Sequence, residues 1–399
     1  MPFFRRAAAA LALTIAIPSL ASAQTAACGG DFGSFLSGVQ QEALAAGISE
    51  NAVGRSMARI GNAPDAKVLS RDRSQGVFSQ TWAEFAGRMV NASRLRLGKA
   101  NLQKYASTFA RIEAETGVPG PAITAFWGLE TDYGAVLGDF NTLAALATLA
   151  HDCRRPELFR PHLIAAMRVV DAGYLTPEQM KGAWAGELGQ TQILPEEYME
   201  FGTDADGNGT VDLLSDTPDV LATTGKFMQS LGWRAGEPWL EAVKVPADFP
   251  WNRAALDNKE PRASFADLGI TKADGSSLER DALPASLILP MGRGGPAFLA
   301  FQNFDVYLQW NNSLVYSLSA AYFSTRLAGA APIDMGSPEQ GLSVEQMKAL
   351  QTRLAGKGYE VGKVDGILGG NTRGAVRKEQ LRLGLPADGW PTPALLAAM

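Results

Sequence analysis

The chain has 399 residues and carries 36 Lys and Arg against 41 Asp and Glu, a net charge of −5. This length allows two domains, and 46% hydrophobic residues suffice for a full-sized core. The acidic balance argues against nucleic acid as a partner. Only two histidines are present, which argues against zinc-amidase and Ser-His-Asp hydrolase chemistry.

The first 23 residues have the features of an export signal. Two arginines precede the apolar run 7–17, and Ala21-Ser22-Ala23 suits a signal peptidase. The run is too short to span a membrane. Thr25 replaces the Leu that a lipoprotein signal would place three residues before Cys28, so we expect no membrane anchor. The mature chain is predicted to begin near Gln24 and to be soluble and periplasmic.

Cys28 and Cys153 are the only cysteines of the chain. An even number of cysteines in an oxidising compartment favours a disulfide, so we predict that these two are bonded. Two independent buried thiols are the alternative. A zinc site from His151, Cys153 and His162 would follow no standard ligand spacing.

The first half of the chain is predicted to be helical. Residues 36–116 have helical periodicity with many Ala and Leu. A more apolar, buried helix is predicted over 121–133, because Pro121 suits a helix start and Gly134 suits the left-handed position past its end.

Glu130 lies near the C-terminal end of this apolar helix and is the candidate catalytic group. Phe126 and Trp127 lie four and three residues before it, on the same face. Aromatic surroundings desolvate a carboxyl and raise its pKa, which keeps a general acid protonated near neutral pH. Asp132, two residues on, points elsewhere. The alternative for Glu130 is a partly buried acid paired with an Arg or Lys.

Helical pattern continues over 141–172, and Thr176-Pro177-Glu178-Gln179 is a capping box that predicts another helix start. A glycine-rich segment, 186–195, follows and is predicted to be a turn that leads into a helix at Pro195. In this segment Gly189 lets the backbone approach a ligand. The Gln192 amide can hydrogen-bond sugar hydroxyls and an N-acetyl group, and Tyr198 is available for stacking or hydrogen bonding.

Together, segments 122–134 and 186–195 resemble the catalytic signature of the B-type lytic murein transglycosylases, and the resemblance spans most of 35–328. It implies that Glu130 is the single catalytic acid and that Gln192 lines the cleft beside it. Two positions depart from the family pattern: Ala183 stands where a serine is frequent, and Glu187 where an apolar residue is common.

A candidate cation loop follows the second motif. Oxygen ligands at alternate positions, with Gly209 at the sixth, match the first half of an EF-hand loop, and some family members bind a metal in a comparable loop. Ser215 replaces the bidentate Glu at the twelfth position; Asp216 or Asp219 could substitute only in a longer loop. A turn that needs no metal is the alternative to a structural Ca²⁺. The candidate ligands are Asp204, Asp206, Asn208, Thr210 and Asp212.

Residues 234–300 are rich in prolines and short apolar runs, which predicts a few short strands and irregular structure. A helix is predicted over 312–327. Within it, Tyr316 matches the family's closing segment, in which a tyrosine borders the catalytic site; a core aromatic is the alternative. A linker is predicted over 329–341.

The tail is a separate unit that resembles the small three-helix peptidoglycan-binding domain of many wall hydrolases. The match covers 342–399 and includes the capping box Ser343–Gln346 and the paired residues Asp365-Gly366 and Asp388-Gly389. The tail has eight Lys and Arg against five Asp and Glu, a net +3 that suits a polymer bearing carboxylates.

The sequence thus predicts a signal peptide (1–23) and a linker (329–341). The resemblance implies a mainly α, lysozyme-like catalytic domain with a small irregular or β region (24–328) and a wall-binding domain (342–399). It implies cleavage of the β-1,4 bond between N-acetylmuramic acid and N-acetylglucosamine with no cofactor required. Peptidoglycan strands are the expected partner, and cell-wall machinery proteins are further candidates. A hydrolytic muramidase, with Glu187 as second acid, and a non-catalytic scaffold remain alternatives.

Overall fold

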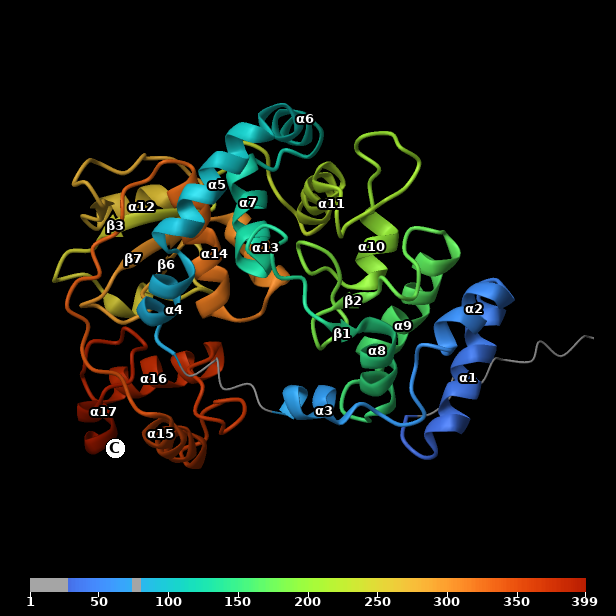
Figure 1. Ribbon diagram of the computed structural model, residues 1–399. Helices are drawn as coiled ribbons and strands as arrows, with labels where there is room; N and C mark the ends of the chain where they lie inside the picture. Colours follow the sequence, from blue (N-terminus) through green and yellow to red (C-terminus); the bar gives the residue numbers. More distant parts are fainter. Residues whose placement is uncertain (1–27, 74–79) are drawn as a thin grey trace, which may run out of the picture.

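The computed structural model describes residues 28–73 and 80–399 (Figure 1). The predicted export signal lies outside these described residues. The described chain is mainly helical with two small sheets, as predicted, and each of its helices is too short or too polar to span a lipid bilayer. The helices that precede the larger sheet are α1 (Phe32–Ala45), α2 (Glu50–Met57), α3 (Ala66–Arg73), α4 (Trp82–Met89), α5 (Ala92–Lys104), α6 (Ala106–Thr116), α7 (Gly120–Thr131), α8 (Thr142–His151), α9 (Pro156–Asp171), α10 (Pro195–Phe201) and α11 (Thr217–Ser230).

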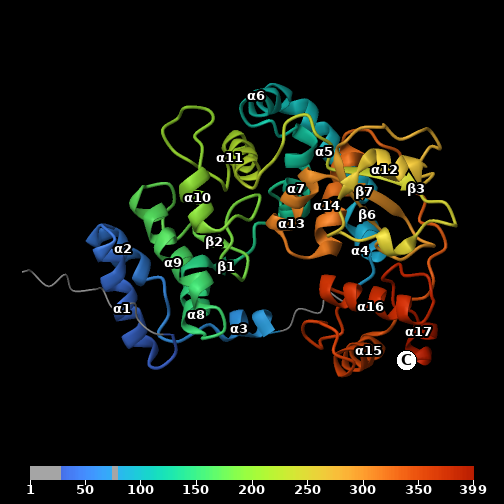
Figure 2. The ribbon, with the colours of Figure 1, turned by 180° about the vertical axis from the view of Figure 1, so that it is seen from behind.

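Helix α7 is the central element of the molecule, and the prediction of a buried apolar helix here is confirmed. Ten of its 12 residues are buried. The helix ends at Thr131, two residues earlier than predicted, because Asp132 and Tyr133 both adopt left-handed backbone with φ of 51° and 64°. Figure 2 shows α7 between the sheet layer on one side and helices α8, α9, α1 and α2 on the other.

The first helices are tied to the segment after α8 by the predicted disulfide between Cys28 and Cys153, which is formed. This bond excludes a zinc site that uses the Cys153 thiolate. The His151 ring instead contacts the Gly30 carbonyl oxygen through Nε2, at 3.2 Å. A partly buried ion pair adds to the junction, with Arg160 Nη2 2.5 Å from Glu42 Oε2.

The prediction of a helix that starts at Thr176 is wrong. The Gln179 side chain does accept from the Thr176 amide, as in a capping box, but only a single turn forms. The chain then enters strand β2 (Lys181–Gly182), which pairs with β1 (Phe140–Asn141) in the smaller, two-stranded sheet. Pairing with β1 therefore overrides the local capping signal.

The larger sheet confirms the prediction of short strands in this part of the chain. It is antiparallel, with strand order β4-β6-β7-β3-β5. An apolar core that includes Phe265, Leu287 and Leu299 lies against it. The strands and the short helix in this region are β3 (Leu240–Lys244), β4 (Glu260–Pro261), α12 (Arg262–Asp267), β5 (Thr271–Lys272), β6 (Pro284–Ile288) and β7 (Ala297–Ala300).

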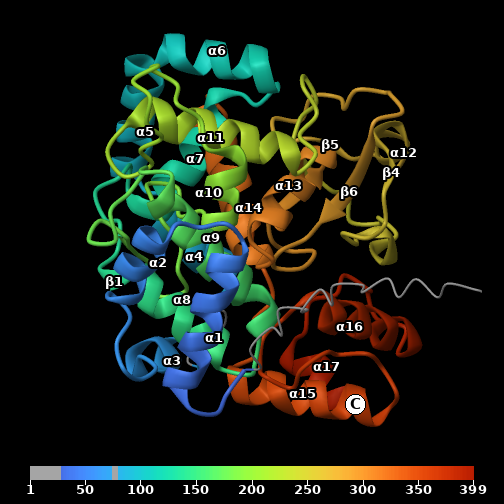
Figure 3. The ribbon, with the colours of Figure 1, turned by 90° about the vertical axis from the view of Figure 1, so that its right-hand side faces the viewer.

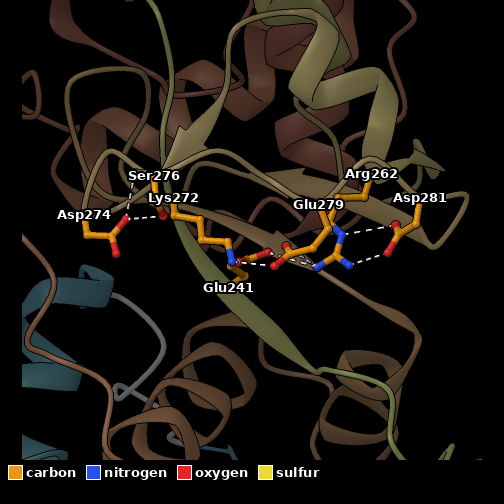
Figure 4. A network of polar contacts seen from close by, with 7 residues as sticks. All are labelled: Glu241, Arg262, Lys272, Asp274, Ser276, Glu279 and Asp281. Carbon is orange, nitrogen blue, oxygen red and sulfur yellow. Dashed lines mark hydrogen bonds and ion pairs between the residues drawn. The ribbon is translucent and has the colours of Figure 1, made fainter.

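A network of charges fastens the first turn of α12 to this sheet (Figure 4). The Arg262 guanidinium contacts Glu279 at 3.0 Å and also pairs with Asp281 and Glu241. Lys272, on β5, contacts Glu279 at 2.5 Å. These acids and bases satisfy one another, so the network has a structural role at the edge of the catalytic unit.

The chain then returns to helices α13 (Gln302–Trp310) and α14 (Leu314–Leu327), of which α14 packs against α7 and matches the predicted helix. The tail forms three helices, as predicted, namely α15 (Val344–Gly356), α16 (Gly370–Arg382) and α17 (Pro393–Ala398). The capping box at Ser343 is present, and Met347, Leu350 and Leu354 form the core stripe.

The connection between the units is irregular, as predicted, but it is packed rather than loose. The Ser337 amide donates to the Gly294 carbonyl oxygen at 2.8 Å, and the Ile333 amide donates to the Tyr322 hydroxyl at 3.2 Å. The tail itself contacts the sheet side of the catalytic unit, where Figure 3 shows it. Arg373 donates to the carbonyl oxygens of Leu289 and Pro290.

Candidate active site

Glu130 stands in the last turn of α7, and its side chain is partly buried. Its Oε1 atom accepts two hydrogen bonds, from Trp310 Nε1 at 3.2 Å and from the Tyr316 hydroxyl. Burial raises the pKa of Glu130 to about 7, and the two hydrogen bonds oppose this shift without cancelling it. A carboxyl with this pKa can act as both acid and base near neutral pH.

The aromatic wall of the site differs from the one predicted. The Trp310 ring contacts Glu130 and stacks on Phe126, with 4.2 Å between ring centroids. Phe126 is therefore a support behind the wall. Trp127 points toward the second motif, where its Nε1 donates to Gln190 Oε1 at 2.7 Å. The prediction that Phe126 and Trp127 together flank the carboxyl is thus corrected.

The second motif forms a tight loop that is fastened to α7. Leu188 and Ile193 form an antiparallel bridge that closes it. The Thr131 hydroxyl donates to the Gln190 carbonyl oxygen at 2.6 Å, one residue past Glu130. Gly189 has a φ of 76°, and a Cβ there would lie 2.6 Å from the Leu213 carbonyl oxygen, so only glycine fits. The loop is thereby held against the end of the catalytic helix.

Gln192 has a left-handed backbone, with φ of 52°, and its side chain stabilises the loop. Its Nε2 atom donates to the Gly189 carbonyl oxygen at 2.8 Å and to the Leu137 carbonyl oxygen at 3.2 Å. The side chain is only partly buried. The amide nitrogen is therefore committed to the backbone, and a contact with sugar would fall to the rest of the side chain.

The expectation that Tyr198 forms a platform for sugar is corrected by its burial. The side chain is completely buried. Its hydroxyl donates to the Val211 carbonyl oxygen at 2.8 Å and accepts from the Leu213 amide at 3.3 Å. Tyr198 is therefore a core residue that supports the chain after the second motif.

Asp132 is directed away from Glu130, as predicted. Its Oδ1 atom lies 2.6 Å from Arg94 Nη2, on helix α5. Tyr133 adds to this support because its hydroxyl donates to the Arg94 carbonyl oxygen at 2.7 Å. Asp132 therefore holds the end of α7 in place and leaves Glu130 as the acid that faces the aromatic wall.

The candidate cation loop brings three carboxylates together. Ligand oxygens of Asp204, Asp206 and Asp219 lie within 4.8 Å of one another. Asp219, at the start of α11, thus supplies the distant acid that a longer loop requires. Asp212 lies outside this group, and its carboxylate accepts from the Leu214 amide at 2.8 Å. Three hard oxygen ligands around one point fit Ca²⁺.

Two features of the site escaped the sequence reasoning. The first is the Trp310 hydrogen bond to Glu130, for which the Trp310-Asn311-Asn312-Ser313 segment beside Tyr316 was the available signal. The second is Arg94, which fixes Asp132 from a helix that carries no motif. Tyr316 lies at the predicted place, in contact with Glu130.

Comparison with known proteins places this arrangement in a family. Residues 31–325 match the model of the transglycosylase SLT domain, and residues 343–399 match that of a peptidoglycan binding domain. The membrane-bound lytic murein transglycosylase B of Escherichia coli is 25% identical over 239 residues, which is 60% of this chain and 65% of that protein's length.

Solved structures extend the comparison. The crystal structure of SltB3 from Pseudomonas aeruginosa, in complex with NAG-anhNAM-pentapeptide, is 37% identical, with a TM-score of 0.86. The match covers 93% of this chain and 99% of SltB3. The Escherichia coli lytic transglycosylase Slt35, in complex with calcium, shares the fold at 23% identity, with a TM-score of 0.63, over 79% of this chain and 98% of that one. The chain therefore belongs to the transglycosylase SLT family and is a lytic transglycosylase with a C-terminal peptidoglycan-binding domain.

Proposed function

We propose that this enzyme cleaves the β-1,4 bond between N-acetylmuramic acid and N-acetylglucosamine and leaves a 1,6-anhydro-muramic acid end. The observation that carries this proposal is the Glu130 carboxyl, whose one oxygen accepts from Trp310 and Tyr316 while burial raises its pKa to about 7. The relative SltB3, at 37% identity, has been solved with NAG-anhNAM-pentapeptide, which supports the anhydro product.

We assign different tasks to the two oxygens of Glu130. Oε1 accepts two hydrogen bonds, so the acid proton resides on Oε2. In the first step Oε2 gives this proton to the glycosidic oxygen, and the N-acetyl group of the muramic acid supports the oxocarbenium-like charge. The donors at Oε1 stabilise the carboxylate that forms.

In the second step the Glu130 carboxylate takes the proton of the C6 hydroxyl, whose oxygen bonds to C1 and closes the anhydro ring. One carboxyl thus returns to its starting state, and no water is consumed. Gln192 and Gly189 are proposed to line the cleft through the loop that faces the end of α7, and Tyr316 through its contact with Glu130.

Hydrolysis is the second candidate, and it would need another carboxylate to activate water. Glu187 is the first suspect, but its Oε2 atom is buried from solvent. Only the other oxygen of Glu187 is then left to activate a water, so we rank ring closure above hydrolysis.

Mass spectrometry of digested sacculi tests the proposal. Anhydro-muropeptides are the expected products. Reducing-end muropeptides would instead establish hydrolysis, and intact sacculi would establish a non-catalytic scaffold.

The other parts of the chain support a role at the wall. The tail is proposed to bind peptidoglycan, and residues 1–23 to direct export to the periplasm without a membrane anchor. Cell-wall machinery proteins are proposed as further partners. The Asp204, Asp206 and Asp219 carboxylates are proposed to hold a structural Ca²⁺, whose positive charge would offset their mutual repulsion. Catalysis itself is proposed to need no cofactor.

A further inference from the structure

A cavity of about 780 Å³ lies between the catalytic unit and the tail. On the catalytic side its wall is formed by residues 311–315, where α14 begins, and on the tail side by residues 366–370, where α16 begins. Figure 1 shows α16 of the tail below α4 and α14. Pockets that bury small ligands have volumes of about 300–1,000 Å³, so this cavity is large enough to hold an organic ligand.

The charged side chains that line this cavity are both arginines. Arg155, which precedes α9, and Arg373, on α16, belong to its wall, and none of the described residues that line it is acidic. Helix α16 also begins in this wall, at Gly370, and no side chain caps its first turn, so the positive end of its dipole adds to the potential. Guanidinium groups match carboxylates in shape and charge. The cavity is therefore suited to a ligand that bears carboxylates.

Arg373 is a cation without an acid. Its Nη2 atom donates to the Pro290 carbonyl oxygen at 2.7 Å and its Nη1 atom to the Leu289 carbonyl oxygen at 3.3 Å. Its Nε atom is buried without a partner, and the side chain makes no ion pair within the described part of the chain. Burial lowers the pKa of Arg373 to about 10, so the group is still charged near neutral pH. A desolvated charge without a counter-ion is costly, and a bound carboxylate would supply the counter-ion.

Arg155 shares its acid with a neighbouring arginine. Its Nη2 atom lies 2.5 Å from Asp72 Oδ1, and Arg154 pairs with the other oxygen of the same carboxylate. One carboxylate against two guanidinium groups leaves one positive charge in excess. The Arg155 side chain is 39% exposed. Arg155 therefore keeps the capacity to bind a further anion in the cavity.

The cavity shares one wall with the active site. Residues 311–315 line the cavity, and the residues on either side of this segment, Trp310 and Tyr316, donate to Glu130. The Ser313 hydroxyl accepts from the Tyr316 amide at 3.4 Å, which fixes the segment to the start of α14. A ligand in the cavity is therefore separated from the Glu130 carboxyl by a single segment of chain.

We propose that this cavity is a subsite for the peptide stem of peptidoglycan, and that Arg373 and Arg155 recognise the free carboxylates of the stem. In the substrate, the muramic acid that is cleaved at C1 carries its peptide through the lactyl ether at C3 of the same ring. The peptide thus leaves the sugar close to Glu130. This inference rests on the proposed function and deepens it, because it makes peptide-bearing strands the preferred substrate.

The test compares kcat/KM for two soluble glycan oligomers of the same length, one with peptide stems and one without. The wild type should prefer the oligomer with stems by roughly tenfold or more, because hydrogen bonds between charged groups are strong. Arg373→Gln and Arg155→Gln should each lower this preference, mainly through a higher KM for the oligomer with stems. A third oligomer, whose stem carboxylates are amidated, tests the wild type directly and should be cleaved no faster than the oligomer without stems.

Two other arginines provide matched controls. Arg377 also reaches from α16 to the catalytic unit, with Nη1 3.3 Å from the Ala254 carbonyl oxygen, but it does not line this cavity. Arg154 also pairs with Asp72 and does not line it either. Arg377→Gln and Arg154→Gln should keep the wild-type preference. Melting temperatures show whether each variant folds, and the amidated oligomer keeps the test decisive if a variant does not.

Three outcomes overturn the inference. The first is a wild-type enzyme that cleaves the three oligomers at equal rates. The second is a loss of activity in the Arg373 and Arg155 variants that is the same with and without stems, which indicates a merely structural role. The third is an equal loss of preference in the control variants, which indicates an effect of tail docking. Failure of the proposed function is distinct, because the wild-type enzyme then releases no anhydro product from any oligomer.

Discussion

The proposed catalytic acid, Glu130, and the acidic loop at Asp204 use the carboxyl group in opposite ways. Glu130 has one oxygen bound by two side-chain donors, and burial raises its pKa to about 7. Asp204 is only partly buried, and the amides of Gly207, Asn208 and Gly209 donate to its carboxylate. These backbone donors lower its pKa, the Gly209 amide most strongly. Backbone amides thus fix a permanent charge, whereas burial with few donors leaves a proton that can move.

The largest expected effect comes from removing the Glu130 carboxyl, the first of the two acids compared. Glu130→Gln should reduce cleavage by roughly 10²–10⁴-fold, because an amide is nearly isosteric but cannot give and retrieve a proton. Release of anhydro-muropeptides is the measurement, with melting temperature and sacculus binding as checks of the fold. Asp132→Asn is the matched control, since Asp132 pairs with Arg94 away from the aromatic side chains that contact Glu130. Activity of Glu130→Gln within about tenfold of wild type would refute the assignment.

The next effect concerns the loop. If Asp219 completes a Ca²⁺ site, the ion should raise the melting temperature of the wild-type protein, by an amount that corresponds to about 2.7 kcal/mol at a hundredfold excess over Kd. Asp219→Asn should abolish this response while the enzyme retains its activity below the melting temperature.

Asp274→Asn is the control for this experiment, because Asp274 lies in a similar turn, bonded to Ser276, but is not one of the three clustered carboxylates. It should keep the full response to calcium. A wild-type melting temperature that ignores calcium would show that the loop is a turn that needs no metal.

A smaller effect is expected when one of the two hydrogen-bond donors to Glu130, the Tyr316 hydroxyl, is removed. Tyr316→Phe should lower activity roughly ten- to a hundredfold, because a hydrogen bond to a charged group contributes about 1.5–3 kcal/mol. That bond stabilises the carboxylate and so lowers the pKa of Glu130; its loss therefore moves the alkaline limb of the pH profile to higher pH. Tyr307→Phe removes another tyrosine hydroxyl of the core, bonded to Ser324, and should leave the limb unchanged. A shift of the alkaline limb to lower pH in the Tyr316→Phe variant would contradict this account.

The smallest effect is expected from removal of the tail, which leaves Glu130 and the Asp204 loop unchanged. Truncation before Pro338 should slow the digestion of insoluble sacculi several-fold, because the tail raises the local concentration of substrate. Soluble glycan fragments without peptide stems should be cleaved at a near-normal rate. The melting temperature should also fall, since Trp390 is buried in the main core and Arg373 contacts Leu289 and Pro290. Equal loss of both activities, with an isolated tail that fails to bind sacculi, would make the tail a stabilising element only.

Helices whose ends depend on neighbouring residues could be predicted from the sequence. The apolar run before Glu130 and the flanking Pro121 and Gly134 predicted α7, and the capping box at Ser343 predicted α15. The capping box at Thr176 failed because strand pairing with β1 competes there. Contacts between distant residues could not be read from periodicity: Trp310, rather than Trp127, reaches Glu130 across 180 residues of sequence. The prediction that Tyr198 is available to sugar was wrong for the same reason, since its burial depends on contacts with Val211 and Leu213.

The disulfide between Cys28 and Cys153 also has a topological consequence. It closes a covalent ring that contains α7 and therefore Glu130. A single proteolytic cut within this ring leaves the two pieces joined, so a nicked enzyme migrates as one chain on a denaturing gel until reductant is added. Every element from α1 to α8 is then retained on the molecule after such a cut, and the catalytic helix cannot be shed by one cleavage.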